Sequence, residues 1–288
     1  MSRASITPRV LLDGLAYVES PRWHDGRLWF PHWGTDEVLA VDLDGKVEVV
    51  AHRPSSGLGD GIAFLPDGRL LITGDRLMRQ EPDGSLVEHS DLSHLTKHGW
   101  SEITVDGRGN IYVNSINFDF MAGAQPTGAP GIVALITPDG AVRQVADGIA
   151  FPNGMVVSPD NETLIIAESF AAKLTAFEIA QDGTLSNRRT WAEGVGPDGI
   201  CMDADGAIYC SSKPGEKNLL RVREGGEVSD RIELDRFCFA TALGGPGRQT
   251  LFMMCAEWDG PDGVEDAIKR RTGQVLVADA PAPGVGWP

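Results

Sequence analysis

The 288-residue sequence has no apolar run approaching the roughly 20 residues that a membrane-spanning helix needs. Its first residues, MSRASITPRVLLDG, also lack the apolar core of a secretory signal. Basic residues are few: 25 Lys and Arg stand against 41 Asp and Glu, a formal charge of −16. Such a charge repels phosphate backbones and acidic lipid surfaces. We therefore expect no nucleic-acid partner, no membrane partner and a cytoplasmic location.

Cysteine is also scarce, and several catalytic signatures are absent. The four cysteines lie in apolar, strand-like segments without CxxC spacing. This favours buried, reduced thiols over a zinc site or a disulfide framework. The sequence contains no Gly-x-Ser-x-Gly elbow and no GxxxxGK[ST] loop, which argues against a serine hydrolase and a P-loop enzyme.

A short repeated pattern organises the whole chain. A turn followed by a β-rich run occurs six times, at 24–30, 66–74, 106–115, 158–169, 203–212 and 244–256. The spacing of about 40 to 50 residues is that of propeller blades. Each copy is followed by a second hairpin pattern, marked in most copies by Asp-Gly or Gly-Gly. Two hairpins per repeat predict four-stranded blades, but the last copy lacks its fourth strand.

The missing strand is predicted at the start of the chain. RVLLDGLAYVES at 9–20 aligns without gaps on RQVADGIAFPNG at 143–154, so residues 9–12 match an outermost strand. Placing that strand in the final blade closes the ring and hides its edges. The sequence therefore predicts an all-β, six-bladed β-propeller as a single domain over residues 1–288. The stretches 118–131 and 257–271 are expected to be loop excursions.

One position per repeat, just before each innermost strand, carries an oxygen-bearing side chain in five of six copies. The positions are Glu19, Asp60, Ser101, Asn153 and Asp198, with Ala240 in the sixth copy. Inner strands run side by side around the channel, so these side chains converge at one mouth. Taken alone, each Asp or Asn is explained by turn chemistry. Together they favour a hard divalent cation, with Ca²⁺ the first choice and Mg²⁺, Mn²⁺ and Zn²⁺ as alternatives.

Three motifs resemble those of a known family. ESPRW at 19–23 is similar to an ExPxW opening, and PNG at 152–154 with SPD at 158–160 to a PNGxxxSPD segment. The segment 197–209 resembles PDGxxxDxxGxxY. All three belong to the gluconolactonase, regucalcin and senescence-marker-protein superfamily of calcium-dependent lactonases. The resemblance extends over residues 10 to about 278, with the motifs in family order.

The resemblance implies metal ligands at Glu19, Asn153 and Asp198. The fourth family ligand is the first Asn of an NDxxxD segment, where this sequence has Ser101. Because Ser has a shorter side chain, the ion gains a water, recruits Glu102, or binds less tightly. The resemblance also implies that Asp198 is catalytic, either as the base that deprotonates water or as the nucleophile. A role as ligand alone is the other interpretation.

Further residues are candidates for contacting substrate near the mouth. Asp60 and Glu102 are two of them, and turn capping is the alternative role of Asp60. Trp100 and Phe151 are expected to form an apolar wall or to pack in the core. Asn114 and Asn117 follow the second strand of the third blade, where turn chemistry is the alternative. His32, in FPHWGTDE, is expected just after a second strand.

Two classes of function remain. The first is a metal-dependent hydrolase that opens a sugar or other small lactone, with phosphotriester or other ester cleavage as neighbouring chemistry. The second is a non-catalytic propeller that binds a partner. Fold alone does not separate them, but a scaffold has no need of the acid and amide column. Gly99 and Trp100, rather than basic residues, precede Ser101, which favours a less charged or more apolar small-molecule substrate. No pattern indicates an oligomeric state.

Overall fold

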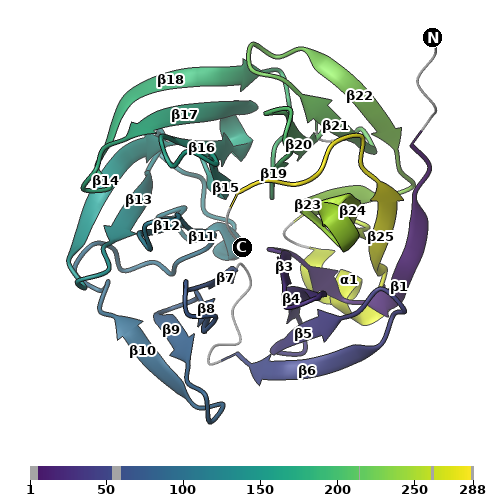
Figure 1. Cartoon of the computed structure of the whole chain (residues 1–288), viewed down its shortest axis with the longest axis horizontal. Helices are drawn as coiled ribbons and strands as arrows, with labels where there is room; N and C mark the ends of the chain where they lie inside the picture. Colours follow the sequence, from purple (N-terminus) through teal and green to yellow (C-terminus); the bar gives the residue numbers. More distant parts are fainter. Residues whose placement is uncertain (1–5, 54–59, 214, 261–262, 287–288) are drawn as a thin grey trace.

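Six antiparallel sheets stand around a common axis as the blades of a propeller (Figure 1). The computed structural model describes residues 6–53, 60–213, 215–260 and 263–286. The predicted six-bladed β-propeller with four-stranded blades is confirmed.

Blades 2 to 5 are each built from four consecutive strands that run from the axis outward. Blade 2 consists of β7 (Ile62–Phe64), β8 (Leu70–Ile72), β9 (Leu77–Gln80) and β10 (Leu86–Ser90). Blade 3 consists of β11 (Ile103–Val105), β12 (Ile111–Ser115), β13 (Gly131–Ile136) and β14 (Val142–Ile149). Blade 4 consists of β15 (Pro152–Val157), β16 (Thr163–Glu168), β17 (Lys173–Ile179) and β18 (Leu185–Glu193). Blade 5 consists of β19 (Cys201–Met202), β20 (Ile208–Ser211), β21 (Asn218–Val222) and β22 (Val228–Glu233).

The outer hairpins of blades 1 to 4 close at the Asp-Gly pairs seen in the sequence. Gly84, Gly140 and Gly183 have φ values of 85°, 85° and 79°, which only glycine adopts without strain. In the first of these turns the carboxylate of Asp83 accepts a hydrogen bond from the Ser85 N–H at 3.0 Å. Local turn chemistry therefore sets where each outer strand reverses.

The two ends of the chain meet in blade 6. Its strands, from the axis outward, are β23 (Phe237–Gly244), β24 (Thr250–Ala256), β25 (Gly273–Asp279) and β1 (Arg9–Leu15). In the antiparallel β1–β25 pair, Arg9 lies opposite Val277 and Val10 opposite Leu276. The predicted closure by an N-terminal outermost strand is confirmed. It removes the free edges that an open ring would expose.

Blade 1 differs because its innermost strand is broken. The outer strands are β4 (Arg27–Trp33), β5 (Glu37–Val41) and β6 (Val47–His52), while β2 (Tyr17–Val18) and β3 (Arg22–His24) both pair with β4. Between the two short strands Ser20 takes a φ of 45°, and Pro21 has no N–H for the ladder. The break places Glu19 at the channel mouth.

Helices are few and short in the part of the chain that the structure describes. There they are the 3₁₀ turns η1 (Phe120–Ala122), η2 (Ser169–Ala171) and η3 (Pro246–Arg248) and the helix α1 (Val264–Arg270). The expectation of a plain loop over 257–271 is therefore wrong, since this segment includes α1, which buries Val264 and Ala267 against blades 1 and 6. None of the helices in the described part of the chain is long and apolar enough to cross a membrane.

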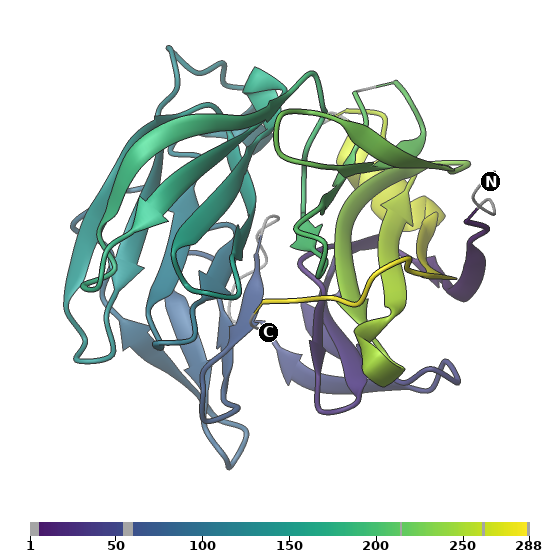
Figure 2. The same ribbon diagram turned by 45° about the horizontal axis from the view of Figure 1, so that its top comes forward.

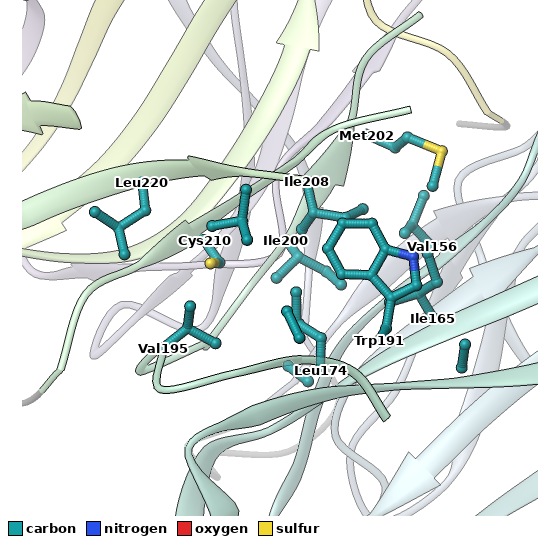
Figure 3. Packing of buried hydrophobic residues seen from close by; sticks show 14 residues of the cluster. Val156, Ile165, Leu174, Trp191, Val195, Ile200, Met202, Ile208, Cys210 and Leu220 are labelled. Carbon is teal, nitrogen blue, oxygen red and sulfur yellow. The ribbon is translucent and has the colours of Figure 1, made fainter. Parts of the chain in front are cut away.

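The core lies between neighbouring blades rather than at the axis. Each adjacent pair of blades shares a cluster of buried apolar side chains, and blades 1 and 6 share a second one with α1. Figure 3 shows the cluster between blades 4 and 5, where Trp191 packs with Ile165 of blade 4 and Ile208 of blade 5. This packing sets the angle between blades and hence where the inner strands converge.

The last described residues cross one end of the ring (Figures 1 and 2). The carbonyl of Pro283 accepts a hydrogen bond from Ala204 N at 2.8 Å, and that of Met202 from Val285 N at 3.1 Å. Because Met202 ends the inner strand β19, the crossing lies at the end of the channel opposite Asp198.

Candidate metal and substrate site

A pocket of about 660 Å³ lies where the innermost strands begin. Its size is within the usual range for small-molecule sites. Five predicted column residues line it together: Glu19, Asp60, Ser101, Asn153 and Asp198.

The sixth position of the column is Phe239, not Ala240. Gly154 N donates to the carbonyl of Asp198 at 3.2 Å, and Gly199 N donates in the same way to the carbonyl of Phe239 at 2.7 Å. Phe239 lines the pocket, whereas Ala240 packs in the core between blades 6 and 1. The cause is a β-bulge that leaves Phe239 unpaired between the pairs Cys238–Cys255 and Ala240–Met254.

Glycines that follow the column residues let neighbouring inner strands approach closely. A Cβ at Gly154 would lie 2.8 Å from the carbonyl oxygen of Asp198. At Gly199 it would lie 2.4 Å from the Cβ of Ala240. Both contacts are too short for any other residue. The Asn-Gly and Asp-Gly pairs therefore have a packing role as well as a place in the column.

Two acidic groups, Glu19 and Asp198, face the pocket at close quarters. Both side chains are partly open to the pocket. Desolvation by the surrounding protein, together with the negative charges of Asp198 and Glu102, nevertheless raises the pKa of Glu19 well above its ordinary value. Desolvation and the charge of Glu102 likewise raise the pKa of Asp198. Two carboxylates with raised pKa values beside one pocket form a site that favours positive charge.

Asn153 holds the Asp198 side chain. The Asn153 side chain hydrogen-bonds to the carboxylate, and its Oδ1 accepts from Gly154 N at 2.9 Å. One carboxylate oxygen, Asp198 Oδ1, is buried with no hydrogen-bond donor among the described residues. An unpartnered buried carboxylate oxygen is costly unless something else neutralises it. A hard cation fits this donor set.

The backbone of Ser101 is tied on both sides. Its N–H donates to the carbonyl of Asn114 at 2.8 Å, and its carbonyl accepts from the Thr73 hydroxyl. Glu102 does not line the pocket: its Oε2 accepts from Ser20 Oγ at 3.1 Å and lies 3.6 Å from Arg22 Nη2. Glu102, predicted from its place beside Ser101 as a residue that the ion could recruit or that could contact substrate, therefore does neither from within the pocket lining. Glu102 is instead a buried negative charge near Glu19 and Asp198.

Within the described residues, no group of three or more His, Cys, Asp and Glu side chains has metal-binding geometry. The ligand set predicted from the sequence has only two such side chains, the carboxylates of Glu19 and Asp198. Its other two donors are the amide of Asn153 and the hydroxyl of Ser101.

Three of the predicted substrate contacts line the pocket. Asp60 is one; its carboxylate lies 2.9 Å from Arg53 Nε, yet burial and the charges of Asp75 and Asp36 raise its pKa to about 7. Trp100 both lines the pocket and packs in the core between blades 2 and 3, so its two alternative roles are combined. Phe151 lines the pocket with a left-handed backbone, φ 60°.

The other predicted contacts lie outside the pocket lining. His32 is inside β4 rather than after it, and is buried: its Nε2 accepts from Ala16 N at 2.9 Å, which leaves Nδ1–H to donate to Thr35. Asn114 is inside β12 and fully buried. Its amide donates to the carbonyl of Asn153 at 2.8 Å, so it supports the column rather than the ligand.

Asn117 also lies away from the pocket lining. It accepts from Thr96 Oγ1 at 2.6 Å and donates to the carbonyl of Pro130 at 3.1 Å. These bonds shape the 118–131 excursion. These contacts agree with turn chemistry, the alternative role predicted for Asn117.

Most of the aromatic lining was missed by sequence reasoning. Blades 3 and 4 contribute four rings, which we call the phenylalanine wall: Phe118, Phe120, Phe151 and Phe170. Blades 1 and 6 contribute five more, the mixed aromatic wall: Tyr17, Trp33, Phe237, Phe239 and Trp258. No sequence periodicity links these residues, because they come from loops, strand ends and a bulge of different blades.

The fold and the site together define a class: a β-propeller with an oxygen-donor ring and an aromatic pocket at one channel mouth. A family model described as "SMP-30/Gluconolactonase/LRE-like region" matches residues 17–257. The chain belongs to this family.

Relatives agree with that assignment, and a solved structure agrees with the fold. The chain is 26% identical to pentonolactonase XacC of Haloferax volcanii, over 88% of this chain and 86% of the relative. It is 26% identical to diisopropyl-fluorophosphatase of Loligo vulgaris, over 68% and 69%. The structure of regucalcin, a calcium-binding protein of Agrobacterium tumefaciens, superimposes with a TM-score of 0.77 at 20% identity, covering 97% of this chain and 98% of that one. At that identity the superposition supports the fold.

Proposed function

We propose that the protein is a metal-dependent hydrolase that opens a small lactone. The observation that carries the proposal is the pairing of Glu19 and Asp198, two acidic groups with raised pKa values beside one pocket, with Asp198 Oδ1 unpartnered among the described residues. A relative that is a pentonolactonase supports the choice of lactones.

Glu19, Asn153 and Asp198 would hold the cation, with Ser101 as a weaker fourth donor. Oxygen donors without sulfur or imidazole favour Ca²⁺, ahead of Mg²⁺, Mn²⁺ and Zn²⁺. The likeness to a calcium-binding regucalcin supports Ca²⁺ as the first choice. When bound, the cation supplies Lewis-acid polarisation of the lactone carbonyl.

Asp198 is the group proposed to move the proton. It takes a proton from water while the water oxygen bonds to the carbonyl carbon. The ring C–O bond then breaks, and the departing alkoxide takes that proton to give the hydroxy acid. Asn153 keeps the carboxylate oriented through its hydrogen bond. Direct attack by Asp198 is the competing route; a single turnover in H₂¹⁸O that leaves ¹⁸O in the Asp198 peptide would establish it.

A second candidate is phosphotriester cleavage at the same site. It is favoured by the relationship to diisopropyl-fluorophosphatase. The non-catalytic binding module is the alternative from another class. We further propose that residues 1–288 act as one domain in the cytoplasm on small-molecule substrates.

The test is hydrolysis by protein stripped with chelator and then restored with Ca²⁺, Mg²⁺, Mn²⁺ or Zn²⁺. The panel contains sugar lactones, γ- and δ-lactones and diisopropyl fluorophosphate. A pH indicator reports the acid that hydrolysis releases. Turnover of a lactone that is restored by metal supports the proposal. Turnover of diisopropyl fluorophosphate alone supports organophosphate cleavage, the chemistry of the second candidate. Absence of all turnover in every metal would overturn both and leave the binding module.

A further inference from the structure

We infer that the substrate carries a large apolar substituent, alkyl or aryl, which packs between the phenylalanine wall and the mixed aromatic wall. The inference rests on the proposed hydrolase function and names the substrate class of that site. The predicted substrate is thus a hydrophobic lactone rather than a polyhydroxylated sugar lactone.

The phenylalanine wall is a continuous apolar surface. Phe151 stacks on Phe170 with ring centroids 4.5 Å apart, and Phe120 meets Phe151 edge-on at 5.0 Å. Phe118 lies 5.9 Å from Phe151. The rings come from the 118–131 excursion, from Phe151 just before β15, and from η2. Their mutual contacts hold the wall in place without a ligand.

The mixed aromatic wall stands across the pocket. Tyr17 contacts Phe239 at 5.3 Å and Trp258 at 5.9 Å between ring centroids. Phe237 meets Phe239 at 4.9 Å. Blades 6 and 1 are opposite blades 3 and 4 in a six-membered ring, so the two walls flank the oxygen-donor column from opposite sides.

Aromatic side chains are concentrated here rather than spread through the molecule. The chain has 10 Phe, 7 Trp and 3 Tyr, and ten of these twenty residues line this one pocket. Among the described residues, the large exposed apolar side chains other than valine are Met121, Phe170 and Trp258, and all three line it. Folding alone gives no reason to leave a Phe 53% exposed. Clustered exposed apolar groups mark a ligand-binding surface.

Polar groups outside the column are few and partly engaged. His98 is paired with Asp119 at 3.1 Å, which leaves Lys97 and Asp75 as charged groups at that edge. A sugar ring with several hydroxyls would lose hydrogen bonds to water against the two walls without replacing them. An alkyl chain gains about fourfold in binding for each methylene buried.

The first experiment compares δ-valerolactone, δ-octalactone, δ-decalactone and glucono-δ-lactone with the Ca²⁺-loaded protein. We expect kcat/KM to rise along the alkyl series and to be lowest for glucono-δ-lactone. A flat or falling series, or preferred hydrolysis of glucono-δ-lactone, would overturn the inference while leaving the hydrolase intact.

A binding readout separates failure of the inference from failure of the proposed function. δ-Lactams with the same alkyl chains resist hydrolysis, and their effect on Tm requires no turnover. If the pentyl-substituted lactam raises Tm more than unsubstituted δ-valerolactam, the apolar site stands even if no lactone is hydrolysed. Equal shifts, or none, would refute it.

Matched variants locate the effect. Phe170 is exposed, so Phe170→Ser should fold normally and lower kcat/KM for δ-decalactone by about tenfold more than for δ-valerolactone. Phe170→Leu, which keeps an apolar side chain, should retain most of the preference. Val228→Ser, at an exposed position on blade 5 outside the pocket, is the control. Equal loss for both lactones in Phe170→Ser would contradict the wall as the chain-binding surface.

Discussion

Asn153 and Asp198 are joined twice across neighbouring blades. The Asn153 side chain hydrogen-bonds to the Asp198 carboxylate, and the N–H of the next residue, Gly154, donates to the Asp198 carbonyl at 3.2 Å. The inner strands of blades 4 and 5 are therefore in register at the channel mouth. A donor amide and a carboxylate are held side by side before any ligand binds.

Asp198→Asn tests the proposed proton carrier. The substitution preserves shape but removes the charge, so we expect the fold to persist and kcat to fall by about 10²- to 10⁴-fold. Hydrolysis of the best lactone at saturating Ca²⁺ gives the measurement, and circular dichroism checks the fold. Asp182→Asn, in an exposed hairpin, is the control. Activity equal to that of the parent would reject Asp198 as base or nucleophile.

Glu19→Gln tests the metal ring from the broken strand of blade 1. A ligand that binds only the folded protein raises its stability by mass action. Losing one carboxylate donor should weaken Ca²⁺ binding and shrink the Ca²⁺-induced rise in Tm. Thermal unfolding in chelator and in a Ca²⁺ series provides the comparison, with Glu48→Gln, at an exposed site, as control. A parent Tm indifferent to every cation tested would count against the whole metal proposal.

Ser101→Asn tests the weak fourth donor. The longer amide brings an oxygen closer to a bound ion, and its backbone position is already held by Asn114 and Thr73. We expect a lower Kd for Ca²⁺, measured by calorimetry, with little change in Tm in chelator. Thr184→Asn, at a hairpin remote from the pocket, controls for general effects. An unchanged or higher Kd would show that Ser101 does not face the ion.

Asp60 predicts a pH effect with a definite sign. Its pKa is raised to about 7, so between about pH 4 and pH 7 the folded protein binds a proton that the unfolded chain has lost. The free energy of unfolding contributed by this group therefore falls as pH rises through that window. Urea unfolding from pH 4 to 8 should show that Asp60→Asn gains stability relative to the parent with rising pH. A difference that moves the other way would refute the raised pKa.

Arg221 provides a prediction about the scaffold. It is fully buried in blade 5, where Nε donates to Asp203 at 2.6 Å and Nη2 to Asp205 at 2.7 Å. Arg221→Met should lower the free energy of unfolding by about 3–5 kcal/mol, because Asp203 is left buried without its cation. Arg231→Met, which breaks only an exposed pair with Glu216, should cost under about 1 kcal/mol. Equal losses in urea unfolding would contradict the buried ion pair.

Much of the fold could be predicted because its determinants are local and repeated. Turn residues before short β-rich runs define each hairpin, and the match of 9–20 to 143–154 located the closing strand. The column at positions 19, 60, 101, 153 and 198 could be found for the same reason. A residue at a constant offset from a repeated strand must recur at a constant place in the ring.

The missed features depend on deviations from the repeat. A one-residue bulge in β23 places Phe239 rather than Ala240 at the pocket. Counting a constant number of residues from the repeated turn cannot detect such a bulge. His32 and Asn114 lie within strands, where His32 Nε2 and the Asn114 amide hydrogen-bond to backbone groups. Whether a polar side chain meets ligand or backbone depends on contacts with residues distant in sequence.

By itself, then, the amino-acid sequence determined the number of blades, the way the ring closes and the ring of oxygen donors, because hairpin turns and strand periodicity are encoded within a few neighbouring residues. The tertiary structure alone decided which way each side chain faces and assembled two aromatic walls from four blades. Those walls depend on the angle between blades, which is set by packing between side chains far apart in the chain.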